Sequence, residues 1–97
     1  MPIYAIWESR FPEPKATEGR AASEAIWRDM TSFAGYLSHE LLVDVDDPGH
    51  LVVFSQWASR EHADSSLRLY ADHPNARTAN NLVAEPRRRL LATRAGD

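Results

Sequence analysis

The chain has 97 residues, 43% of them hydrophobic, which supports one small domain spanning residues 1–97. The net charge of −3 excludes a globally basic surface, so we expect no nucleic-acid partner. The absence of cysteine excludes disulfides, thiolate nucleophiles and thiolate metal sites, and it fits a reducing cytoplasm.

The first expected element is a strand over residues 2–10, in which aromatic and β-branched residues dominate. Glu8 and Arg10 follow too soon for the apolar region of a signal peptide. No run approaches the roughly 20 apolar residues of a membrane span. We therefore expect a cytoplasmic protein without a membrane partner.

An amphipathic helix is expected over residues 15–33. Its apolar residues recur at helical spacing and form one stripe: Ala22, Ile26, Trp27, Met30 and Phe33. Gly19 weakens the first turns by about 1 kcal/mol relative to alanine, so the start of the helix is the weakest part of this prediction. Gly35 suits the C-terminal cap.

A hairpin is expected next, with strands over residues 36–45 and 50–57 and a turn over residues 46–49, where Pro and Gly favour a tight bend. If Val45 faces His50, one set of side chains shares the face of Trp57: Ser38, Glu40, Leu42, Val53 and Ser55. The other face then receives His39, Leu41, Val43, Val52, Phe54 and Gln56.

A second helix is expected over residues 60–71, with Ser59 as its N-cap and an inner stripe that includes Ala63, Leu67 and Tyr70. Asp72-His73-Pro74 ends it. A short helical turn over residues 75–82 and a last strand over residues 86–94 complete the chain. Arg87-Arg88-Arg89 alternates along that strand, which favours a solvated edge over a nucleic-acid patch.

The predicted order is β-α-β-β-α-β, an α+β fold with a four-stranded antiparallel sheet and two helices on one face. Both faces of the central hairpin are apolar, whereas a half-solvated sheet alternates between apolar and polar residues. The second face therefore needs a cover. A second copy of the sheet is the simplest cover, so we expect a homodimer.

The segment Ser55-Gln56-Trp57-Ala58-Ser59, the turn over residues 46–49, Phe33-Ala34-Gly35-Tyr36 and Asp72-His73-Pro74 together resemble the antibiotic biosynthesis monooxygenase (ABM) family. The resemblance extends from residue 2 to about residue 94. It implies a ferredoxin-like monomer in a dimeric α/β barrel, with a cleft between helices and sheet. It also implies cofactor-independent oxidation of a polycyclic or quinol-type aromatic by O2.

Trp57 is the central candidate of this site, either as a platform for an aromatic ligand or as a core residue at a strand end. The resemblance implies an Asn where this chain has Val53, a Tyr where it has Ala63, and an Arg that Arg77 matches in spacing. Substrate contacts are expected from Trp57, His73, Tyr70 and Val53.

Glu40 and His39 are the candidate bases. A carboxylate beside a Trp can have a raised pKa, and histidine titrates near pH 7. The structural alternatives are a hydrogen bond from Ser55 to Glu40, a dimer-interface role for His39 and a helix-capping role for His73. His50 and His62 are expected to be solvated. In the catalytic hypothesis Arg77 stabilises an oxyanion.

Three functions remain open at this point. The first is the cofactor-independent monooxygenase, with no cofactor, no metal and a small aromatic partner. The second is a non-catalytic small-ligand-binding or stress-related protein on the same scaffold, which the residues at positions 53 and 63 favour. Haem binding or degradation is the third.

Overall fold

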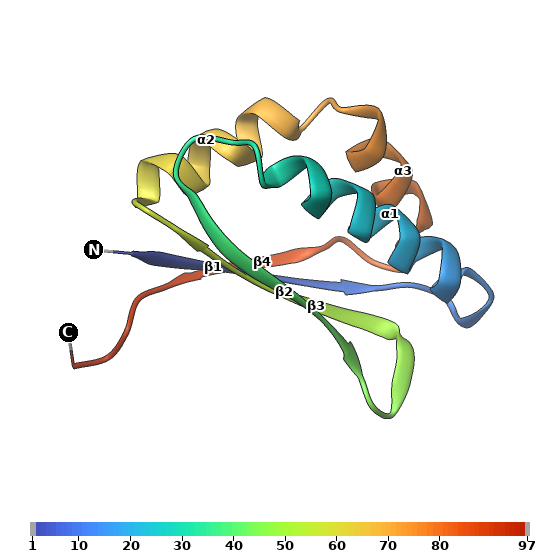
Figure 1. Ribbon diagram of the computed structural model, residues 1–97. Helices are drawn as coiled ribbons and strands as arrows, with labels where there is room; N and C mark the ends of the chain where they lie inside the picture. Colours follow the sequence, from blue (N-terminus) through green and yellow to red (C-terminus); the bar gives the residue numbers. More distant parts are fainter. Residues whose placement is uncertain (1, 97) are drawn as a thin grey trace.

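The computed structural model describes residues 2–96. Its elements in chain order are β1 (Ile3–Arg10), the short 3₁₀ helix η1 (Glu13–Lys15), α1 (Ala16–Met30), β2 (Tyr36–Asp44), β3 (Asp47–Trp57), α2 (Arg60–Tyr70), α3 (Pro74–Leu82) and β4 (Arg88–Ala92). The strands form one antiparallel sheet in the order β2-β3-β1-β4, and all α-helices cover one of its faces (Figure 1). The predicted α+β fold is confirmed.

The helices differ from the prediction at two places. α1 ends at Met30, three residues early. α3 is a full helix of nine residues where a short turn was predicted. Its N-cap is His73, whose Nδ1 accepts a hydrogen bond from the backbone N–H of Asn75 at 3.1 Å, and Pro74 occupies the first helical position, where its missing N–H is tolerated.

Two glycines are fixed by close approaches. Gly35 has φ +83°, and a Cβ at this position would overlap the ring of His62, so only glycine allows the chain to pass from α1 into β2 here. A Cβ at Gly19 would overlap the ring of Phe11. The helix accepts the low propensity of glycine at this position because Phe11, which is buried, packs directly against it.

The β2–β3 connection is tighter than predicted. Strand pairing continues to Asp44 opposite Asp47, and only residues 45 and 46 form the turn. The carboxylate of Asp44 accepts a hydrogen bond from the N–H of Asp46 at 2.8 Å, which supports that turn. Pro48 and Gly49 instead belong to β3, where the register shifts through a bulge.

The predicted register of this hairpin is therefore wrong by one residue. Leu41 faces Val53, and Glu40 faces Phe54. Because side chains alternate along a strand, this shift exchanges the two faces of β2. His39 lies on the helical side of the sheet with Trp57, and Glu40 lies on the opposite side.

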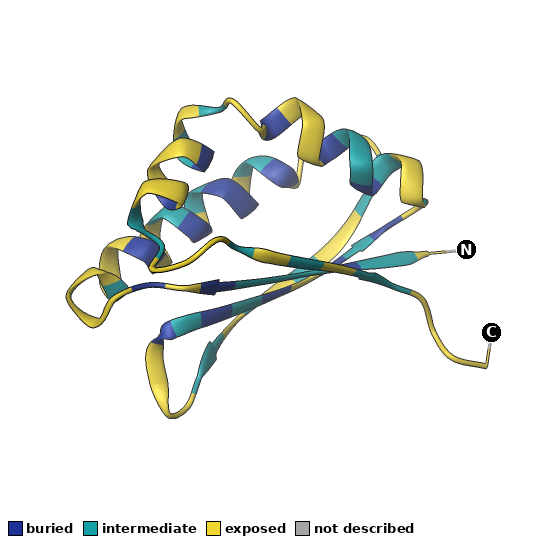
Figure 2. Ribbon diagram, turned by 180° about the vertical axis from the view of Figure 1, so that it is seen from behind, coloured by how far each residue is buried: buried dark blue, intermediate teal, exposed yellow. Residues whose placement is uncertain are grey.

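The core lies between the sheet and the helices (Figure 2). Trp57 is the largest of its fully buried side chains and is only 1% exposed. Its indole N–H donates to the hydroxyl of Ser55 at 3.0 Å, and Ser55 donates to the carbonyl of Ala5 at 2.7 Å. This buried chain of hydrogen bonds satisfies the polar atoms beneath the helices and holds the indole in one orientation.

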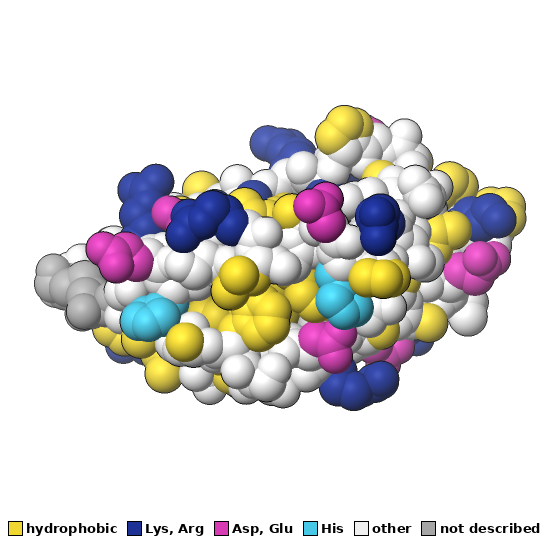
Figure 3. Space-filling view, turned by 90° about the horizontal axis from the view of Figure 1, so that it is seen from above, with side chains coloured by type: hydrophobic (Ala, Val, Ile, Leu, Met, Phe, Trp, Pro, Cys, Tyr) yellow, Lys and Arg dark blue, Asp and Glu magenta, His cyan; other side chains and the backbone are white. Residues whose placement is uncertain are grey.

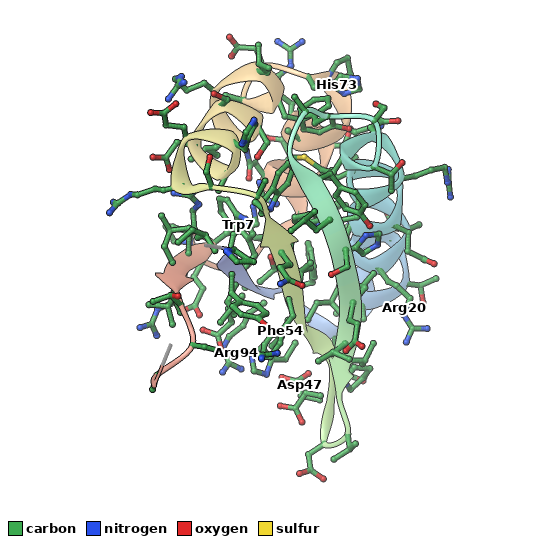
Figure 4. All side chains as sticks on the ribbon, turned by 60° about the vertical axis from the view of Figure 1, so that its left-hand side comes forward. Trp7, Arg20, Asp47, Phe54, His73 and Arg94 are labelled. Atoms are coloured by element: carbon green, nitrogen blue, oxygen red, sulfur yellow. The ribbon has the colours of Figure 1, made fainter. Side chains whose placement is uncertain are left out.

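The sheet face that the helices leave uncovered is here called the open face. It carries Ile6, Leu42, Val52, Phe54 and Leu90, and three of these are strongly exposed: Leu42 at 43%, Phe54 at 44% and Leu90 at 58%. Trp7 and Phe54 lie on opposite sides of the sheet (Figure 4). The expectation that both hairpin faces are apolar is confirmed.

Candidate functional site

A cavity of about 650 Å³ lies between the helices and the sheet. Aromatic and aliphatic side chains supply most of its wall, among them Trp7, Trp27, Met30, Trp57 and Tyr70. Seen from the helical side, the outer surface shows hydrophobic side chains near its middle and charged side chains on several sides of them (Figure 3). A mostly apolar concave site with few polar groups is typical of small-molecule binding.

The sheet and α1 supply the three tryptophans. Trp7 and Trp57 come from β1 and β3, which are neighbouring strands, and Trp27 comes from α1 above them. The polar end of Trp57 is already occupied by Ser55, so this side chain offers the cavity apolar surface. Such surfaces suit a planar aromatic ligand.

Tyr70 lines the cavity but is engaged elsewhere. Its hydroxyl donates to Asp29 Oδ2 on α1 at 2.7 Å, and Asn75 donates to the same carboxylate at 3.2 Å. Burial, together with this hydrogen bond, raises the pKa of Tyr70 to about 12. Tyr70 is thus a neutral donor that ties the α2–α3 corner to α1, and it is not a base.

Two arginines line the cavity on the β4 side. The guanidinium of Arg87 lies 5.2 Å from the ring centroid of Trp7, and that of Arg89 lies 5.7 Å from it. Burial lowers the pKa of Arg87. The prediction that the arginines of this strand are solvated is therefore wrong for Arg87 and Arg89. Arg88 between them is 82% exposed on the open face.

A carboxylate from the segment before β4, that of Glu85, also lines the cavity. Its Oε1 lies 3.5 Å from Nε of Arg10, and both side chains are about half exposed. Among residues 2–96, Glu85 is the one carboxylate in the cavity wall, and no histidine is part of that wall.

The residues predicted for the site divide into two groups. Trp57 and Tyr70 line the cavity, and Val53 is buried in the core beneath it without reaching the wall. Glu40 is exposed on the open face and Arg77 is exposed on α3, so the structure does not bring them to the cavity. Their catalytic roles stay predictions.

His39 and His73 lie near the cavity but outside its wall. His39 forms a hydrogen bond of 2.6 Å between Nδ1 and the hydroxyl of Tyr36, and burial lowers its pKa. It borders a separate, shallower hollow beside Trp27. His73 stacks on Tyr70 with ring centroids 4.3 Å apart, so it packs from outside against a residue of the cavity wall.

His50 is not solvated as expected. Its Nε2 lies 2.7 Å from Glu8 Oε2 and its Nδ1 lies 2.8 Å from Asp44 Oδ2, with the side chain 12% exposed. The hydrogen bonds with Asp44 and Glu8 raise the pKa of His50, and the same bonds lower the pKa of each carboxyl group. This cluster lies at one end of the open face. His62 is also partly buried, with Nδ1 2.8 Å from the hydroxyl of Ser59.

Comparison with known proteins identifies the family. The family model for the antibiotic biosynthesis monooxygenases matches residues 2–71, and the chain therefore belongs to this family. No curated protein matches the sequence significantly. Within residues 2–96, no helix is long and apolar enough to cross a membrane, and no cluster of His, Asp or Glu is arranged to hold a metal ion.

Solved structures support the same fold. SnoaB, a cofactor-independent oxygenase from Streptomyces nogalater, is 14% identical with a TM-score of 0.86 and covers 99% of this chain and 95% of its own. Rv0793 from Mycobacterium tuberculosis is 20% identical with a TM-score of 0.79 and covers 100% of this chain and 98% of its own. PA3566 from Pseudomonas aeruginosa is 15% identical with a TM-score of 0.77 and covers 98% of this chain and 95% of its own. At these identities the likeness establishes the fold alone.

Sequence reasoning missed the residues of the wall to which the site gives a role: Trp7, Trp27, Glu85, Arg87 and Arg89. The alternation of side chains along the strands carried a signal for Trp7 and Arg89. Trp7 pairs with Arg89 across β1 and β4, so both lie on the helical face. Finding it required the β1–β4 register, which no local pattern defines.

Proposed function

We propose that this protein binds a planar aromatic molecule in the cavity beneath its helices and oxidises it with O2 without a cofactor. The observation that carries the proposal is the cavity itself, about 650 Å³ with three tryptophans in its wall. Membership of the antibiotic biosynthesis monooxygenase family supports the reaction class. SnoaB, a cofactor-independent oxygenase of the same fold, supports the absence of a cofactor.

The proposed reaction requires few functional groups from the protein. An anthrone-type substrate loses a proton to give an electron-rich phenolate, which passes one electron to O2. The two radicals then combine into a peroxide. Loss of water from this peroxide gives the quinone, so one oxygen atom enters the product and the other leaves in water. The protein must accept the proton, hold the ring and exclude bulk water.

Glu85 is the proposed proton acceptor because it is the carboxylate that lines the cavity. Glu40, the base expected from the sequence, lies on the other side of the sheet. His39 is on the helical side but its ring contacts Tyr36 and Trp27 outside the cavity wall. Trp57 is the proposed ring platform.

The test is O2 uptake by the purified protein with a panel of anthrones and hydroquinones. We expect turnover above the uncatalysed rate, reduced about tenfold or more in Trp57→Phe and in Glu85→Gln. The control is Leu69→Ala, because Leu69 is 75% exposed on α2 and is not part of the cavity wall. Turnover that is equal in all four proteins, or no turnover with any substrate, would contradict the oxygenase proposal.

Non-catalytic binding is the second candidate, and one observation favours it. The positions at which the family resemblance implies polar partners for Trp57 hold Val53 and Ala63, and both are buried in the core. Binding of an aromatic ligand without O2 uptake would establish this function. A haem titration followed at the Soret band tests the third class in the same preparation.

We also propose that the functional unit is a homodimer with its two open faces in contact. Exposed Leu42, Phe54 and Leu90 give each copy an apolar surface that no other part of residues 2–96 covers. A matching face on a second copy would remove this surface from water.

A further inference from the structure

The cavity is apolar on most sides but cationic at the end next to β4. Arg87 and Arg89 both line it there, and both guanidinium groups lie within 6 Å of the ring centroid of Trp7. Placement over an aromatic face stabilises a cation modestly. It does not neutralise the charge.

The two arginines differ in their counter-charges. Arg89 Nη2 lies 3.1 Å from Asp64 Oδ1, which offsets its charge, although its Nε is buried without a hydrogen-bond partner in residues 2–96. Arg87 forms no ion pair or hydrogen bond within the same residues. The neighbouring Glu85 is paired with Arg10.

A cation that is partly withdrawn from water and lacks a counter-ion is costly, and an anion brought by a ligand would offset that cost. We propose that the cavity selects an aromatic anion, a planar ring system that carries one carboxylate or ionised phenol, and that Arg87 binds the acidic group. The inference rests on the proposed aromatic site in the same cavity. Guanidinium groups suit it because they present several N–H donors to a carboxylate at once.

The experiment compares 2-naphthoate with 2-naphthamide by titration calorimetry at pH 7. The two probes share a ring system and nearly the same shape, and they differ in charge. We expect the wild-type protein to bind the naphthoate about tenfold tighter or more, as for a hydrogen bond to a charged group. Arg87→Gln should weaken only naphthoate binding, and Arg87→Lys should restore part of the preference.

Two further variants locate the effect. Arg77→Gln is the control, because Arg77 is exposed on α3 and does not line the cavity, so it should keep the full preference. Arg89→Gln should reduce the preference less than Arg87→Gln, because Asp64 already offsets Arg89.

The outcomes separate the two proposals. Unchanged naphthamide binding by Arg87→Gln, with the naphthoate preference lost, supports the inference and shows that the variant is folded. Equal affinity of the wild-type protein for both probes overturns the anion inference but leaves the aromatic site intact. Failure of the wild-type protein to bind either probe overturns the aromatic site, and the anion inference with it.

Discussion

The two faces of the sheet are built from the same strands but have different chemistry. The helical side holds the cavity, with Trp57 beneath it and, at one end, Arg87, which has no counter-ion among residues 2–96. The open face has an apolar centre around Phe54, and its charged groups are paired with one another at one end, as in His50 with Glu8. The difference teaches that apolar side chains alone do not locate the site. What distinguishes the cavity is a partly buried charge without a counter-ion in residues 2–96, since the unpaired Glu40 of the open face is exposed.

Two histidines of the β2–β3 hairpin show the same contrast. On the helical side, burial lowers the pKa of His39. At the end of the open face, hydrogen bonds with Asp44 and Glu8 raise the pKa of His50. The helical side therefore disfavours a protonated imidazole, whereas the open face favours one.

The largest expected effect concerns the folding of the helical side. Trp57→Ala removes the largest fully buried side chain and its hydrogen bond to Ser55, so the free energy of unfolding should fall by about 3–5 kcal/mol in urea denaturation. Leu69→Ala is the control, because Leu69 is 75% exposed on α2 and should change stability by less than about 0.5 kcal/mol. A loss below about 1 kcal/mol for Trp57→Ala would show that the core does not depend on this residue.

The next effect concerns the assembly through the open face. Phe54→Asp places a carboxylate in the middle of the proposed interface, so the dissociation constant of the dimer should rise about 100-fold or more. Sedimentation velocity over a concentration series measures it. Val45→Asp, at the hairpin tip where Val45 is 96% exposed, should leave the dimer intact. A wild-type protein that stays monomeric at high concentration would refute the proposed dimer.

The smallest effect is a pH dependence with opposite signs on the two faces. The pKa of His50 is raised in the folded state. Its contribution to the free energy of unfolding is therefore complete below the unfolded-state pKa of about 6.5 and is lost as pH rises through the folded-state pKa. Because the pKa of His39 is lowered, His39 destabilises the fold as pH falls below about 6.5.

Histidine NMR titration measures both values directly. His50 should titrate above about 6.5 and His39 below it. In denaturation experiments, His50→Gln should reduce the loss of stability as pH rises above about 6.5, and His39→Gln should reduce the loss that begins as pH falls below about 6.5. Titration of the two imidazoles at the same pH would show that the two faces do not differ in this respect.

The elements could be predicted from the sequence because their signals are local. Ser59 caps α2 as expected, with its hydroxyl accepting from the N–H of His62 at 3.2 Å. The hairpin register could not be predicted from the sequence, because Pro48 and Gly49 are typical of a turn but form a bulge within β3. That one-residue error placed Glu40 on the face of Trp57. Arg87 could not be assigned to the cavity because its position depends on how α2 and α3 pack over the segment before β4.

The placement of the tryptophans has a practical consequence. The chain contains three, and all of them line the cavity. Intrinsic indole fluorescence of the unlabelled wild-type protein therefore comes from the cavity wall, and only Trp27 also borders the shallower hollow beside His39. A ligand that binds beside these tryptophans should quench or shift their emission. Aromatic compounds can therefore be screened for binding by fluorescence, without a label.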